Sequence, residues 1–176
     1  MIKNKQEIIK EDLEQEDYYE EEYIEKASEK YSKLIGEFII KFSGLEHEMN
    51  VAIAEAFFDD DHDTGYTVIE KLSFFDKVDL FYKMYLKRAY HNDEGNISKL
   101  KKIKTKFEEI NAFRNKVVHA NWSTLTKEGF VRTKITVDNA DGIVKFIKVK
   151  ILPKNIREFI KKIDSLINQL DNYKNN

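Results

Sequence analysis

Hydrophobic residues recur at intervals of three and four in four segments of the chain, residues 31–57, 72–90, 96–117 and 155–173. This spacing places the apolar side chains on one face of an α-helix and leaves the charged side chains on the other. The four segments therefore predict four amphipathic helices. Because each helix has one apolar face to bury, they are expected to pack as an antiparallel helical bundle.

Residues that cap helix N-termini occur near the start of two of these segments. Ser73 is followed three residues later by Asp76, a capping-box pattern with Asp in the usual place of Glu. Asn96 or Ser98 can cap the next helix, whose apolar residues extend to Val117. The residues after His119 have no clean helical pattern, so this helix is expected to end there.

The hydrophobic period changes to two between residues 129 and 152. Val131, Thr133 and Ile135 alternate with more polar residues, the turn sequence DNADG follows, and a second alternating run leads to Pro153. This arrangement predicts a β-hairpin at about residues 129–152, with proline ending its second strand. The predicted fold is mostly α, an antiparallel helical bundle with one β-hairpin inserted before the last helix.

Charge divides the chain more sharply than its net value of −2 suggests. Residues 1–29 contain eleven Asp or Glu and four Lys, a balance of −7, so residues 30–176 carry +5. The first segment favours helix but has a weak apolar stripe, and it either forms an N-terminal helix or stays mobile. We therefore expect an acidic N-terminal helical arm, residues 1–29, and a helical domain, residues 30–176.

Composition excludes several classes of protein. The sequence contains no cysteine, which rules out disulfides and thiolate metal sites and fits a reducing compartment. It contains no run of about 18 apolar residues and no secretory signal, so we expect a cytoplasmic protein without a membrane span. His47, His62 and His91 lack ligand spacing, and no Gly-rich phosphate loop is present, so we expect no metal and no cofactor.

The acidic segment DDDHDTGYTVIE has two interpretations. Asp59, Asp61, Asp63 and Glu70 occupy positions 1, 3, 5 and 12 of a calcium-binding loop. However, Gly65 stands at position 7, one place later than such a loop requires. The sequence therefore favours an acidic loop between helices, with a calcium site as the alternative.

The stretch NAFRNKVVHANW contains the polar residues that stand out from the helical pattern. Asn111, Asn115 and His119 follow one another at intervals of four, which stacks them on one face of the third predicted helix. Arg114 lies beside this line. On a straight helix Arg114 and His119 are about 140° apart, so a looser helix end, a long arginine side chain that wraps round the helix, or a second subunit is needed to bring them together.

Arg114 to His119 resemble the R-N-x-x-x-H signature of the HEPN superfamily, and FSGLEHEMN, KLSFFDKVDLF and Trp122 are similar to its neighbouring features. The resemblance covers residues 31–172. It implies an α-helical dimer in which the two motifs face each other. Many members are metal-independent endoribonucleases in toxin–antitoxin, abortive-infection and CRISPR-linked defence systems, whereas others keep the fold without activity.

These residue types suit RNA cleavage. Histidine can transfer protons near neutral pH, and arginine binds phosphate oxygens in pairs. Asn115 either orients His119 or binds phosphate, and Glu46 either reaches the cleft or is a surface carboxylate. The expected site comprises catalytic Arg114 and His119, supporting Asn115, Asn111 and Glu46, and RNA-binding Lys116 and Trp122.

The sequence thus predicts a metal-independent HEPN endoribonuclease, of the kind that serves as a toxin or antiphage defence effector. Its expected partners are RNA, a second copy of the chain, and an antitoxin or other defence-system protein. The alternative is a catalytically silent HEPN module that binds a partner protein or a nucleotide. The clusters LKKIKTK and FIKVK either contact RNA phosphates or are solvated faces.

Overall fold

The computed structural model describes residues 21–57, 62–89, 94–120, 122, 125–126, 129–137 and 144–174, and side chains within 25–56, 63–87, 96–120, 122 and 150–171. Its helices are α1 (Glu21–Phe57), α2 (His62–Ile69), α3 (Phe74–Ala89), α4 (Glu94–Val118) and α5 (Pro153–Lys174). Its strands are β1 (Leu125–Thr126), β2 (Gly129–Val137) and β3 (Val144–Ile151).

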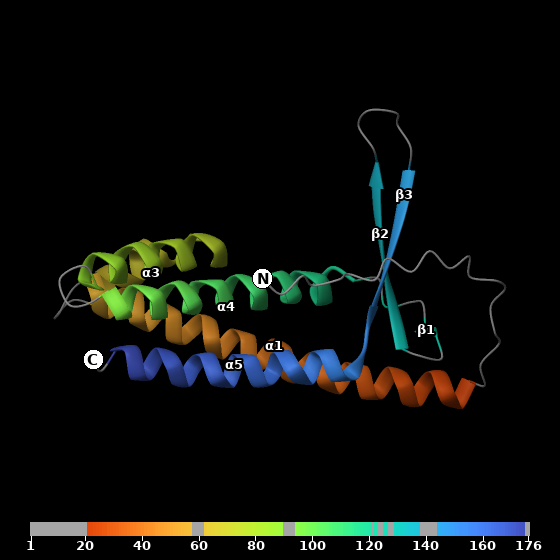
Figure 1. Cartoon of the computed structure of the whole chain (residues 1–176). Coiled ribbons are helices and arrows are strands. Elements are labelled where there is room, and N and C mark those ends of the chain that lie inside the picture. The colour runs from red at the N-terminus through yellow and green to blue at the C-terminus, as the bar shows by residue number, and fades with distance from the viewer. Residues whose placement is uncertain are drawn as a thin grey trace.

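The helices pack around the long helix α1. Helices α5, α2 and α3 all contact α1, and α4 lies against α3 on one side and α5 on the other. Figure 1 shows α4 and α5 extending along α1, while α3 covers only the first part of α4. The second half of α4 therefore has no α3 beside it. The predicted helical bundle is confirmed.

The core consists of the apolar faces that the helical spacing predicts. On α1, Leu45, Met49 and Ile53 are fully buried. Aromatic rings join the other helices to this face. The ring of Phe113 packs edge-on against Phe38 at 5.4 Å between centroids and stacks on Phe159 of α5 at 3.9 Å. Burial of each such ring contributes roughly 1.5–3 kcal/mol, so these contacts fix α4 between α1 and α5.

Two helix starts show how the sequence sets their boundaries. The backbone N–H of Asp76 donates to Ser73 Oγ at 3.2 Å, and Ser73 Oγ–H donates to Asp76 Oδ2 at 2.6 Å, which confirms the predicted cap of α3. At the start of α5 the N–H of Leu152 donates to Asn155 Oδ1 at 3.1 Å. Pro153 is the first residue of α5, where a missing backbone N–H costs no helical hydrogen bond.

Helix α1 begins ten residues earlier than the apolar spacing predicts. It starts at Glu21, so the last part of the acidic segment continues into α1 without a break. The predicted boundary between residues 29 and 30 thus falls inside one helix. Residues 1–20 lie outside the described residues.

The acidic segment predicted as a loop contains helix α2, which does not favour the calcium alternative. His62–Ile69 is helical, so the middle of the twelve-residue stretch cannot wrap around an ion. Gly65 allows this helix to lie close to α1, since a Cβ added there would come within 2.7 Å of Ala54 Cα. Asp59 and Asp61 lie outside the described residues.

Strands β2 and β3 pair antiparallel in the region where the sequence predicts a hairpin. Their register runs from Phe130 opposite Ile151 to Val137 opposite Val144, and β1 pairs with the start of β2. The predicted turn, residues 138–143, lies outside the described residues, so the complete hairpin stays a prediction. Tyr31 Oη donates to the carbonyl oxygen of Ile151 at 2.8 Å, which ties the end of β3 to α1.

Candidate active site

The polar motif lies at the C-terminal end of α4. The helix ends at Val118, the N–H of His119 donates to the carbonyl oxygen of Asn115 at 3.2 Å, and the N–H of Ala120 donates to that of Val117 at 3.4 Å. The predicted end near His119 is thus confirmed. The His119 side chain is exposed to solvent, so its imidazole is accessible to a ligand.

Arg114 is held by a ring and an amide. Its guanidinium carbon lies 5.6 Å from the centroid of the Phe42 ring, and Nη1 donates to Asn115 Oδ1 at 3.1 Å. Among the residues that the structure describes, no carboxylate forms an ion pair with Arg114. The half-buried guanidinium therefore keeps its positive charge uncompensated and retains N–H donors for an anion.

The surroundings of Arg114 combine this charge with exposed hydrophobic side chains. Phe42 in turn packs against Phe74 of α3 at 4.7 Å between ring centroids. The next residue, Phe75, is 59% exposed, and Val118 on the last turn of α4 is 44% exposed. Val118 follows Arg114 by four residues, so it lies on a neighbouring part of the α4 surface.

One chain does not bring Arg114 and His119 together. Helix α4 runs to Val118, and on a regular helix positions 114 and 119 are about 140° apart around the axis. Within the described part of the chain no hydrogen bond joins them. A site in which an arginine and a histidine both act on one phosphate therefore needs one of them from a second subunit.

The other predicted site residues divide into near and far neighbours of Arg114. Asn115 accepts its hydrogen bond, and half-buried Asn111 lies about 60° from it around the helix axis. Lys116 lies about 160° from Arg114. Asn111 and Asn115 thus stay with the site, whereas Lys116 lies on the opposite side of α4.

Glu46 has a structural partner. Lys77 Nζ, on α3, lies 2.7 Å from Glu46 Oε1, and Lys77 is only 7% exposed. A buried ammonium needs a nearby carboxylate, so Glu46 is committed to neutralising Lys77. We therefore assign Glu46 to the fold and not to the predicted supporting group.

Trp122 is likewise used for packing. Its indole Nε1–H donates to the carbonyl oxygen of Val117 at 3.1 Å, and its ring lies 5.9 Å from that of Tyr31. The half-buried indole caps the end of α4 and holds the following segment against α1. These contacts occupy much of the surface that stacking on an RNA base would need.

No protein-family model, curated protein or solved structure matches the chain. Within the residues described, no three histidine, aspartate or glutamate side chains are grouped so that they could hold a metal ion. No described helix has the length and apolar character needed to cross a membrane.

Proposed function

We propose that the protein is a HEPN-type, metal-independent endoribonuclease that acts as a two-fold dimer in the cytoplasm. The observation that carries this proposal is the uncompensated guanidinium of Arg114, held over Phe42 and five residues before the exposed imidazole of His119. The R-N-x-x-x-H spacing that resembles the HEPN signature supports it. Toxin or antiphage activity, with an antitoxin or other defence protein as partner, belongs to the same proposal.

The proposed reaction needs a base, an acid and a cation. His119 takes the proton from an RNA 2′-hydroxyl, and the 2′-oxygen forms a bond to the adjacent phosphorus. The bond from phosphorus to the 5′-oxygen breaks, and that oxygen receives a proton from the His119 imidazolium of the second subunit. Arg114 binds the phosphate oxygens on which charge develops. The products are a 2′,3′-cyclic phosphate and a 5′-hydroxyl.

The geometry of one chain favours a dimer for this chemistry. Arg114 and His119 diverge on α4, and one copy supplies a single histidine for two proton transfers. A two-fold interface brings the same surface together twice. Val118, which is exposed one helical turn after Arg114, is a suitable residue for such an interface.

One observation supports the alternative of a catalytically silent module. Arg114 is already bonded to Asn115, and the His119 side chain has no hydrogen-bond partner among the described residues. Such a site can bind a nucleotide phosphate or a partner protein without assembling an acid and a base.

Replacement of His119 by Ala tests the proposal. Wild-type protein is expected to cut labelled RNA in EDTA, and His119→Ala is expected to lose about 10²–10⁴-fold in cleavage rate, the usual cost of removing an acid–base group. Melting temperature and mass by light scattering are measured on the same samples. His47→Ala is the matched control, because His47 is also exposed but lies on α1, and it should cut like wild type.

Each contrary result has a distinct meaning. A His119→Ala protein that melts like wild type and still cuts RNA removes the catalytic role of His119. Wild-type protein that cuts no RNA favours the silent module. A wild-type monomer at micromolar concentration contradicts the dimer.

A further inference from the structure

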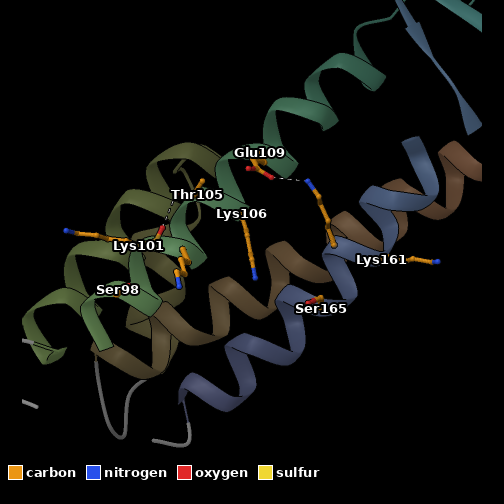
Figure 2. Close-up of a pocket in the computed structure, with 9 residues that line it drawn as sticks. Ser98, Lys101, Thr105, Lys106, Glu109, Lys161 and Ser165 are labelled. Carbon is orange, nitrogen blue, oxygen red and sulfur yellow. Dashed lines mark hydrogen bonds and ion pairs between the residues drawn. The ribbon is translucent and has the colours of Figure 1, made fainter. Parts of the chain in front are cut away.

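A groove of about 640 Å³ lies between α4 and α5, on a different side of α4 from Arg114. Figure 2 shows its lining side chains, with Lys106 reaching from α4 into the space between the two helices. Five lysines from two distant parts of the sequence line this groove, which we call the lysine groove: Lys101, Lys102, Lys106, Lys161 and Lys162. In Figure 2 the side chains of Lys101 and Lys161 lie at its rims and point outward, away from the space between the helices.

Most of this positive charge is uncompensated. Lys162 Nζ lies 3.0 Å from Glu109 Oε2, and Lys106 Nζ donates to the neutral amide oxygen of Gln169 at 2.6 Å. The remaining three lysines are exposed and have no ion pair among the described residues. Five lysines and one glutamate give the lining a charge of +4, within a chain whose net charge is −2.

The other lining groups also suit a phosphate backbone. Ser98, Thr105 and Ser165 place hydroxyl groups around the lysines, and none of the described lining residues is aromatic. Ammonium and hydroxyl groups bind phosphate oxygens regardless of base sequence, whereas base recognition in single strands relies on aromatic stacking. The groove therefore has the chemistry of a backbone contact.

We propose that the lysine groove binds the phosphodiester backbone of RNA and leads the strand toward the end of α4. Its identity as an RNA site rests on the proposed function. Lys102 and Lys106 precede Arg114 by twelve and eight residues, which corresponds to about 12–18 Å along the helix axis. An RNA strand whose scissile phosphate lies at Arg114 therefore reaches the groove only if it extends several nucleotides beyond that phosphate.

Neutralising the three unpaired lysines tests this proposal. The variant Lys101→Gln/Lys102→Gln/Lys161→Gln keeps Lys106 and Lys162, which join the two helices. Fluorescence anisotropy with a labelled 20-nucleotide RNA, in EDTA and across a salt series, gives its affinity. We expect about tenfold weaker binding and a log–log salt slope smaller by about 2, from three lost contacts at about 0.7 each. Single-turnover cleavage at saturating RNA should not change.

The control variant Lys71→Gln/Lys87→Gln/Lys154→Gln removes the same charge from exposed positions elsewhere. Equal affinity and salt slope in the two variants would overturn the proposal. Loss of affinity for a polyglutamate peptide, with RNA binding unchanged, would also overturn it and assign the groove to acidic proteins. If wild type cuts no RNA but the groove variant alone loses RNA binding, the groove stands and the ribonuclease proposal fails.

Discussion

Two cations, Lys77 on α3 and Arg114 on α4, have different surroundings. Lys77 is one helical turn beyond Phe74, almost fully buried, and its ammonium lies 2.7 Å from the carboxylate of Glu46. Arg114 lies over the ring of Phe42, is half-buried, and is bonded to the neutral amide of Asn115. One charge is neutralised by the chain itself, and the other is not.

The difference separates a structural group from a binding group. A buried ammonium with its own carboxylate is satisfied in the folded chain, and loss of either partner leaves a buried charge. A guanidinium that is held in place by an aromatic ring and a neutral amide still has its positive charge available to bind an anion. The first arrangement is expected to contribute to stability and the second to binding of phosphate.

The largest expected effect follows from Arg114→Ala. We expect RNA cleavage to fall about 10²–10³-fold, because charge-assisted contacts to the transition state contribute most to rate. Stability should change by less than about 1 kcal/mol, the size of a partly exposed cation–π contact. Cleavage assays and urea unfolding on the same preparation check both values. Parallel loss of activity and stability would show that Arg114 is also a structural residue.

Lys77→Met is expected to give the opposite result. It leaves Glu46 without its partner and should lower the free energy of unfolding by about 1–3 kcal/mol, with cleavage per folded molecule unchanged. The double variant Lys77→Met/Glu46→Gln should recover part of the loss, because no unpaired charge remains. If Lys77→Met abolished cleavage in a fully folded protein, the Glu46–Lys77 pair would belong to the active site.

Hydrophobic spacing was sufficient to predict the bundle because it reports burial directly. The faces of α1 and α4 that it marks are the buried ones. It missed α2, since the segment contains Asp, Thr and Gly, which are weak helix formers. Close packing of Gly65 on Ala54 accounts for that helix, and this contact is tertiary. The sequence predicted a helical arm in this region but not its continuity with α1 from Glu21, because residues 21–29 have only a weak apolar stripe.

The sequence predicted where the candidate site lies along the chain but not which side-chain contacts surround it. The spacing of four placed Asn115 and His119 on one face and ended the helix at the right residue. Stacking of Arg114 on Phe42 joins residues 72 positions apart, and the pairing of Glu46 with Lys77 joins α1 to α3. No local pattern reports such contacts. The contact of Trp122 with Tyr31 is also long-range, and no local pattern predicts it.

The smallest expected effect concerns a third cation, Lys104, which shares Asp79 with Lys83. A hydrogen bond from Lys83 lowers the pKa of Asp79 from its ordinary value of 3.8, and one from Lys104 adds to this. A carboxylate with a lowered pKa in the folded state contributes stability above its unfolded pKa and loses it as pH falls through the folded value. Asp79 and its two lysines are more exposed than Lys77. Asp79→Asn should therefore lower the melting temperature only slightly at pH 7. The difference in melting temperature from wild type should shrink below about pH 4. Thermal unfolding of both proteins between about pH 2 and about pH 7 measures this trend. A difference that widened as pH fell would show that Asp79 is protonated more readily in the folded chain, against the direction that its two lysines impose.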